Sequence, residues 1–385
     1  MYTAIDDASA SQQQKTSFAC SVAAAHARAA EQNRTLHFDV ARAVIEAGFP
    51  RQFVPRRWGG SEAGFADLLE RAARLAEGCP SAGWCATLLA AHGRLAAHLP
   101  EQGQRDLWSI SPDVPIAAAF APEGGELTRV PGGWRLSGEW ATASAVDHAD
   151  WILLAAFEPP GKGAVVPGAA PSQRLLLVPR EDIRIHATWQ GAGLRGTGSH
   201  SLTVPDARVP AHRTVPRDLV AAGLTGPWAG RQQRLPQALV TSLMFAAPAL
   251  GAARGALAAW WALMRGRRQP DGRPLLSDSA LQQAFAKAGA RIDAAQLLLE
   301  RAAVQADRAP LTALPVARNA RDCAEAIDLL VRAVEGLYRT GGARAQAETG
   351  DLQRYWRDCH AIAAHAAVQP ALSAGLYVRD LLGAP

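Results

Sequence analysis

The sequence predicts an α+β protein with an N-terminal helical domain, a central β domain and a C-terminal four-helix bundle. Two observations carry this prediction. Apolar residues recur at helical spacing before and after the middle of the chain. Residues 113–216 between them consist of short β-prone runs separated by Gly and Pro. With 385 residues, 49% of them hydrophobic, the chain can bury a large core.

The N-terminal domain is expected to cover residues 15–112, after a polar, disordered lead of residues 1–14. Its helical pattern is clear at 67–77, where apolar residues recur with a period of about 3.6. Pro80 and Pro100 each mark the start of a further helix, because proline is tolerated in the first helical turn.

The central domain, residues 113–216, contains short strands with no helical pattern between them, which is typical of an antiparallel barrel or sandwich. Residues 159–171 are expected to form a loop. The strands are expected at 116–120, 133–140, 151–157, 174–178, 183–189 and 200–204.

The C-terminal domain, residues 217–385, contains four helical segments of the length found in helix bundles. Short loops that contain Gly or Pro join them. The helices are expected at 238–267, 278–308, 316–340 and 352–382.

Composition and charge exclude several classes of protein. The 40 basic and 35 acidic residues alternate along the helices and do not form the long basic stripe of a nucleic-acid groove. No uninterrupted apolar run reaches the ~18 residues of a membrane span, and the N-terminus lacks a secretory pattern, so we expect a cytoplasmic protein. The five cysteines show no paired spacing and the ten histidines show no ligand motif, so neither disulfides nor a metal site are predicted.

A glycine-rich segment, residues 191–196, fits the pattern GxGxxG. A dinucleotide-binding turn would need a helix after it, but the next expected element is the strand 200–204, so this function is rejected. The segment still offers backbone N–H groups, and Thr197 and Ser199 add hydroxyl groups that could hold a phosphate or the edge of a flavin. An ordinary β-turn is an equally good interpretation of these residues.

Two histidines are candidates for a functional site. His92 shares a helix face with Trp84 and Leu88 and should point inward. His365 should lie on the same face of the last helix as Arg354 and Asp358, which can form an ion pair with each other. Each histidine could also be a hydrogen-bonded core residue, and the residues alone leave both interpretations open.

Several segments resemble the acyl-CoA dehydrogenase superfold, and within it they are most similar to the oxygenase components of two-component flavin monooxygenases. The likeness is strongest in the Gly- and Trp-rich stretch that begins at Gly132 and in the turn that follows Trp189. The segments that carry it are 132–151, 189–199, 209–210, 79–92 and 352–358, with His365 beyond the last.

This resemblance implies a fold with an N-terminal helical domain, a central antiparallel β-barrel and a C-terminal four-helix bundle, assembled as a homotetramer. It also implies hydroxylation of a small aromatic or natural-product substrate by O2 and reduced FMN or FAD, through a flavin C4a-hydroperoxide. The reduced flavin would come from a separate NAD(P)H-dependent flavin reductase, since the sequence contains no nicotinamide-binding unit.

The resemblance further implies roles for individual residues. Ser144 lies near flavin N5, His365 is a base or hydrogen-bond partner at the reacting centre, and His92 binds the substrate. The residues implied to hold the flavin are Trp140, Ser144, Trp189, Gly196, Thr197, Gly198 and Ser199, with Arg267, Gly341 and Gly342 reaching it from a neighbouring subunit. One departure is visible: Ala145 adds a methyl group where these monooxygenases usually have glycine.

Two other functions stay open. An acyl-CoA dehydrogenase needs a Glu that removes a proton. The two positions where the superfold carries it are Ala366 and Thr241 here, and no Glu occurs between Glu181 and Glu300. A desaturating flavoprotein with an unusual base would hold oxidised FAD tightly and purify yellow. A non-catalytic binding scaffold of the same fold is the other alternative.

Overall fold

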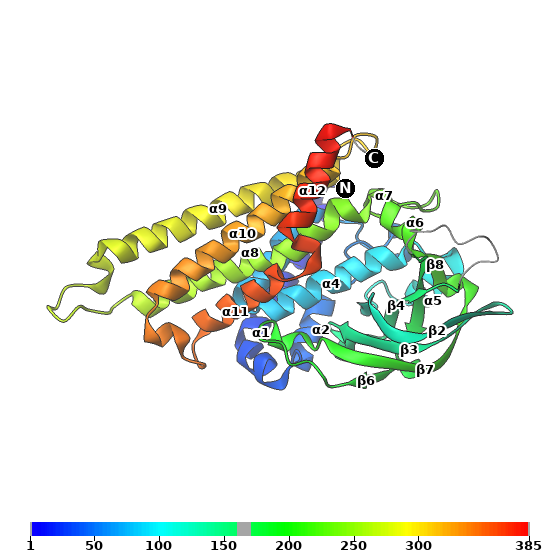
Figure 1. Ribbon diagram of the computed structural model, residues 1–385, viewed down its shortest axis with the longest axis horizontal. Coiled ribbons are helices and arrows are strands. Elements are labelled where there is room, and N and C mark those ends of the chain that lie inside the picture. Colours follow the sequence, from blue (N-terminus) through cyan, green and yellow to red (C-terminus); the bar gives the residue numbers. More distant parts are fainter. Residues whose placement is uncertain (1, 160–170, 384–385) are drawn as a thin grey trace.

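The computed structural model describes residues 2–159 and 171–383, with side chains from Gln12 onward. A long helical bundle extends to one side of the molecule, and the β domain lies at the other (Figure 1). The expected loop at 159–171 lies almost wholly outside the described residues.

The N-terminal domain is helical, as predicted, and Pro80 begins a helix. Its helices are α1 (Tyr2–Asn33), α2 (Phe38–Glu46), α3 (Phe65–Gly78), α4 (Pro80–Ala96) and α5 (Glu101–Trp108).

Helix α1 begins at Tyr2, so the structure does not show the disordered lead expected for residues 1–14. The side-chain amide of Gln12 donates to the carbonyl of Ala47 at the end of α2. The hydroxyl of Thr16 donates to Gln12 O at 3.0 Å. Gln12, a polar residue of the expected lead, therefore bonds to another part of the fold, which a polarity pattern alone could not reveal.

The central domain consists of two open four-stranded sheets. The first has the order β1 (Ile116–Ala119), β4 (Trp151–Phe157), β5 (Gln173–Pro179) and β8 (Thr214–Pro216). The second has the order β2 (Pro122–Val130), β3 (Gly133–Ala143), β7 (His200–Pro210) and β6 (Arg184–His186).

This arrangement corrects the closed antiparallel barrel implied by the resemblance. Over residues 2–159 and 171–383 neither sheet closes on itself, and β1 pairs with β4 in parallel. The two sheets pack face to face instead, as a sandwich. Sequence reasoning also missed β2 and β8, because β2 is largely exposed and β8 has only three residues.

Alternation along the strands explains the packing. In β4, Ile152 and Leu154 face the core between the sheets. Leu153 and Ala155 face a second core, shared with residues of α4 and α5. The first sheet is therefore covered on both faces, which is why its strands are continuous apolar runs.

The C-terminal domain contains the predicted bundle. Two short helices, α6 (Arg217–Ala222) and α7 (Arg231–Arg234), lead into it. Helix α8 is its centre and packs on α9, α10, α11, α3 and α4. The bundle helices are α8 (Gln237–Met264), α9 (Ser279–Arg308), α10 (Val316–Thr340) and α11 (Asp351–Ala363).

Helix α8 is long and apolar enough to cross a membrane by length and composition, with a mean hydropathy of 1.3 in its most apolar window. However, 72% of that window is buried inside the fold. Its apolar character is explained by its position at the centre of the bundle.

The last predicted helix, 352–382, is wrong as a single element. Helix α11 ends at Ala363, a single 3-10 turn covers Ala366–Val368, and α12 begins at Pro370 (Pro370–Leu382). Proline lacks the N–H of a continuing helix and disfavours helical backbone in the residue before it. As a result, His365 is the N-cap of the short turn and does not share a helix with Asp358.

Candidate active site

A cavity of about 290 Å³ lies where α4, the β domain, α8 and the turn after α11 meet. It brings together six residues predicted for the site from distant parts of the chain: His92, Ser144, Trp189, Thr197, Ser199 and His365. Four other aromatic and polar residues that line the cavity were not predicted for the site from the sequence: Trp84, Phe120, Thr142 and Phe245. Of these, Trp84 could have been found, since it shares a helix face with His92.

The glycine-rich turn before β7 forms one wall of the cavity. Leu194 adopts a left-handed backbone with φ 50°, and its N–H donates to Asp358 Oδ1 of α11 at 2.6 Å. Its carbonyl accepts from the indole N–H of Trp189 at 3.0 Å. Burial raises the pKa of Asp358 to about 6. Asp358 thus ties the bundle to the turn.

Gly196 and Gly198 support this wall from behind and do not line the cavity. Gly198 has φ 55°, its N–H donates to Arg34 O at 3.0 Å, and a Cβ there would lie 2.8 Å from Asp147 Oδ2. A Cβ on Gly196 would lie 2.8 Å from the Cβ of Ala30. Both positions favour glycine because the turn packs tightly, against α1 at Gly196 and against Asp147 of the β domain at Gly198, where the positive φ adds to the restriction.

Three hydroxyl groups form a row along the cavity wall. Ser144 Oγ and Ser199 Oγ are 2.7 Å apart, and Ser199 Oγ and Thr197 Oγ1 are 2.6 Å apart. The row begins at the indole N–H of Trp84, which donates to Ser144 Oγ at 3.2 Å. It ends at the carbonyl of Leu194, which accepts from Thr197 Oγ1 at 2.9 Å.

His92 reaches the cavity from α4. Its Nδ1 lies 2.8 Å from the carbonyl oxygen of Ile116. A carbonyl only accepts, so Nδ1 carries the proton and Nε2 keeps its lone pair. Burial lowers the pKa of His92 to about 4, so the ring is neutral at pH 7.

His365 reaches the cavity from the turn after α11 and has the opposite tautomer. Its Nδ1 accepts from the N–H of Ala367 at 3.2 Å, so the neutral ring carries its proton on Nε2. Burial lowers its pKa as well. The ring packs on Phe245, with centroids 4.0 Å apart, and edge-on against Trp84 at 5.6 Å.

Trp140 lies outside this cavity, contrary to its implied place along the flavin ring. It is buried between the two sheets, and its indole N–H donates to Ala155 O at 2.9 Å. Ala145, next to Ser144, has φ 59°, and its N–H donates to Thr197 O at 2.8 Å. The usual glycine at this position fits that left-handed backbone, and the alanine here adopts it at a cost.

Arg267, Gly341 and Gly342 are not brought to the cavity in this chain. Arg267 lies between α8 and α9, and the two glycines follow α10. Both places lie at the end of the bundle remote from the sheets (Figure 1).

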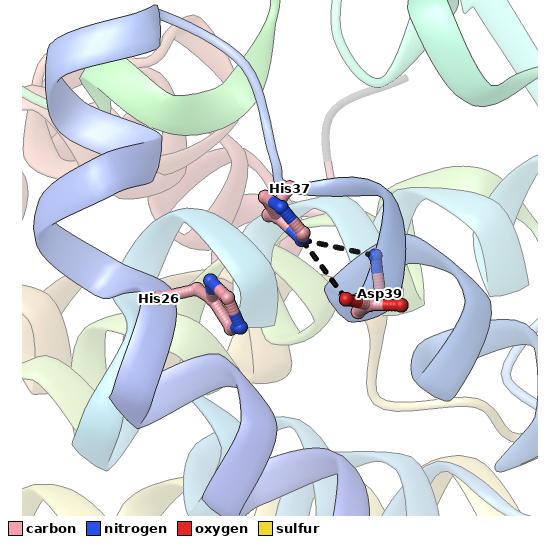
Figure 2. A group of neighbouring side chains, drawn as sticks. All are labelled: His26, His37 and Asp39. Atoms are coloured by element: carbon pink, nitrogen blue, oxygen red, sulfur yellow. Dashed lines mark hydrogen bonds and ion pairs between the residues drawn. The ribbon is translucent and has the colours of Figure 1, made fainter.

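A cluster of His26, His37 and Asp39 places three possible metal ligands within 4.8 Å of one another (Figure 2). The two rings stack with centroids 4.2 Å apart. However, His37 Nδ1 accepts from the N–H of Asp39 at 3.2 Å and so caps α2, and Asp39 Oδ1 lies 3.6 Å from Arg42. Since His37 Nδ1 and Asp39 Oδ1 already have partners and His26 stacks on the His37 ring, we assign the cluster a structural role.

Comparison with known proteins identifies the family. The oxygenase subunit HsaA of the flavin-dependent monooxygenase of Rhodococcus jostii is 31% identical over 373 residues, which cover 93% of this chain and 95% of that protein. The oxygenase component of an FADH2-dependent resorcinol hydroxylase from Rhizobium is 32% identical over 358 residues, covering 88% and 86%. The chain belongs to the oxygenase components of flavin-dependent monooxygenases. The resemblance seen in the sequence is confirmed.

The fold of these oxygenase components is also matched in solved structures. XiaF from Streptomyces, in complex with FADH2 and glycerol, superimposes with a TM-score of 0.89 and 26% identity over 100% of this chain and 98% of that one. Residues 243–370 match the family described as Acyl-CoA dehydrogenase, C-terminal domain. Within this bundle, the positions of a dehydrogenase Glu hold Thr241 and Ala366, neither of which lines the cavity.

Proposed function

We propose that this oxygenase component hydroxylates a small, uncharged aromatic substrate, with reduced FMN or FAD and O2 as co-reactants and a separate flavin reductase as partner. The observation that carries the proposal is that one cavity holds a hydrogen-bond acceptor on His92, a donor on His365 and the hydroxyl row of Ser144, Ser199 and Thr197. The two-component organisation is supported by the names of the relatives.

The residues at the cavity fit a flavin. Trp189 offers a flat apolar surface, and the hydroxyl row offers polar atoms to the edge of a ring. When bound, the reduced flavin supplies the electrons that activate O2. The role of this chain is then to hold the flavin edge at Ser144 and to keep water away from it.

The substrate class follows from the charge of the cavity. Among the residues that the structure describes, no Lys or Arg lines it, and its histidines are neutral at pH 7. A carboxylate buried there would lack a counter-charge, so the buried part of the substrate is uncharged. The aromatic walls of Trp84, Phe120 and Phe245 suit a planar ring.

The two histidines then have different roles, since one accepts a hydrogen bond and the other donates one. Nε2 of His92 accepts a hydrogen bond from a substrate hydroxyl, which makes the aromatic ring more electron-rich and more reactive toward an electrophilic oxygen. It takes the proton as oxygen is transferred, when positive charge developing on the ring makes that hydroxyl acidic. Nε2–H of His365 donates a hydrogen bond at the reacting centre. Of the two roles that the resemblance implies for His365, base or hydrogen-bond partner, this proposal takes the second, and it adds the role of base to His92.

The apolar walls support the exclusion of water. Trp84, Leu88, Phe120 and Phe245 line the cavity beside the two histidines. A site that activates O2 needs such walls, because water diverts the activated oxygen to hydrogen peroxide.

A homotetramer and a cytoplasmic location complete the proposal. Arg267, Gly341 and Gly342 lie at the end of the bundle remote from the sheets (Figure 1). From there they can reach a flavin only in a neighbouring copy of the chain, which supports an assembly in which bundles exchange contacts.

The test is reconstitution with NAD(P)H, a flavin reductase, FMN or FAD, and O2. A panel of phenols should give hydroxylated products in the complete mixture and none without the oxygenase. Carboxylated analogues of the best phenol should react more slowly. Turnover without O2, using an artificial electron acceptor, would contradict the proposal and indicate a dehydrogenase.

A further inference from the structure

The hydroxyl row in the cavity has a fixed direction. A hydroxyl group has one proton to donate and can accept two hydrogen bonds. At one end, the indole N–H of Trp84 can only donate to Ser144. At the other end, the carbonyl of Leu194 can only accept from Thr197.

These two ends determine every proton between them. Thr197 uses its proton on the Leu194 carbonyl, so the 2.6 Å bond to Ser199 must use the proton of Ser199. The 2.7 Å bond between Ser199 and Ser144 must then use the proton of Ser144. All three hydroxyl protons are thus directed away from a ligand, and Ser144 Oγ keeps one lone pair.

A wall that presents lone pairs distinguishes the two redox states of a flavin. Reduced flavin has an N–H group at N5, whereas oxidised flavin has a lone pair at the same atom. The N–H would donate to Ser144 Oγ, but two lone pairs would repel each other or force the row to break a bond.

We propose that Thr197 is a positioning residue that fixes the direction of this row and thereby makes the cavity prefer reduced over oxidised flavin. This inference rests on the proposed function. Thr197 is 1% exposed, and its bond to Leu194 O lies in the turn that Asp358 holds in place. Thr197 does not contact flavin N5 itself. It orients the proton of Ser199, which in turn orients the proton of Ser144, and Ser144 Oγ then offers a lone pair that favours reduced flavin.

The test is the substitution Thr197→Val, which keeps the branched shape and removes the hydroxyl. Ser199 then loses its acceptor and can donate to Ser144, so the proton of Ser144 is free to face oxidised N5. The ratio of the Kd for oxidised FMN to the Kd for reduced FMN should fall about tenfold, the effect of one hydrogen bond. The two-electron midpoint potential of bound FMN should fall by about 30 mV.

Two variants serve as controls for this measurement. Thr87→Val removes another hydroxyl that is 1% exposed and bonded to a backbone carbonyl, Gly83 O at 2.9 Å, but lies outside the row, so the ratio should stay unchanged. Thr197→Ser keeps the hydroxyl and should keep the ratio. If Thr197→Val does not fold, Ser199→Ala breaks the same row and should lower the ratio in the same direction.

The outcomes separate the inference from the proposed function. A folded Thr197→Val protein with the ratio of the wild type, or with both forms of FMN weakened equally, would overturn the role of Thr197. Wild-type protein that binds oxidised FMN as tightly as reduced FMN, and yields no product with reductase-supplied flavin, would overturn the proposed function itself.

Discussion

His92 and His365 reach the same cavity from α4 and from the turn after α11, and burial keeps both rings neutral. They differ in the backbone group beside Nδ1. A carbonyl next to His92 leaves an acceptor on Nε2, while an N–H next to His365 leaves a donor there. When two imidazoles share a protonation state, the neighbouring peptide group decides which one can take a proton.

Of the changes that test this comparison, removing the acceptor on His92 should reduce hydroxylation the most. In His92→Gln the side chain can no longer take a proton, so we expect hydroxylation to slow by about 10²–10⁴-fold, with flavin oxidation diverted to hydrogen peroxide. Product and peroxide should be measured together in the reconstituted system.

A second buried histidine of α4 is the matched control. The two ring nitrogens of His98 lie 3.2 Å from Arg94 O and 3.0 Å from Gln233 O, and burial lowers its pKa to about 4 as well, but it lies outside the cavity. His98→Gln should lower the melting temperature and leave the ratio of product to peroxide unchanged. If the ratio of product to peroxide fell equally in both variants, the effect of His92→Gln would be structural.

Removing the donor should have a smaller effect. His365→Ala deletes one hydrogen bond, so we expect a loss of about three- to tenfold in hydroxylation, with little change in binding of reduced flavin. Stopped-flow hydroxylation and a thermal melt on the same sample separate chemistry from folding. His360→Ala on α11, outside the cavity, is the control. A loss as large as that of His92→Gln would restore His365 as the base.

Asp358 supports both histidines indirectly, because it holds the turn that faces them. Burial raises its pKa to about 6, above the ordinary value near 4. The folded state therefore binds an extra proton between about pH 4 and pH 6, and stability falls as the pH rises through that window. The melting temperature of wild type relative to Asp358→Asn should fall by about 2–5 °C between pH 4.5 and pH 7. A difference that stays constant with pH would contradict this assignment.

Ala145 should give the smallest effect. Because it adopts φ 59°, Ala145→Gly should relieve backbone strain and raise the free energy of unfolding by about 0.5–1 kcal/mol in a denaturant titration. Ala143→Gly, two residues earlier in strand β3, lacks a positive φ and should destabilise the protein. Destabilisation by both changes would show that the buried methyl group of Ala145 outweighs the strain.

The sequence allowed some of this site to be predicted and concealed the rest for physical reasons. His92 could be placed because its helix is regular and because Trp84 lies on the same face of that helix. His365 lines the cavity, but the helix geometry used to place it was wrong, since the break before Pro370 removes it from the helix of Asp358. Its tautomer depends on the N–H of Ala367, which only the folded turn brings beside the ring.

Strand pairing limited the fold prediction in a similar way. The alternation of Trp134, Leu136 and Trp140 along β3 indicates one buried face, so the burial of Trp140 between sheets could have been predicted. The parallel pairing of β1 with β4 could not, because it joins segments more than thirty residues apart through a connection that contains other strands. A sandwich and a barrel therefore have the same local pattern.

The interruption between α11 and α12 places His365 on a short segment that is held by contacts of its own. The hydroxyl of Ser242 in α8 donates to the carbonyl of Ala367 at 2.7 Å, and the guanidinium carbon of Arg321 in α10 lies 4.3 Å from the centre of the Tyr377 ring in α12. Because the turn before β7 is held separately, by the bond from the Leu194 N–H to Asp358, we expect substitutions at these two contacts to move His365 more than that turn. The break before the last helix therefore lets the direction of the His365 ring be tuned from residues that are not themselves part of the cavity.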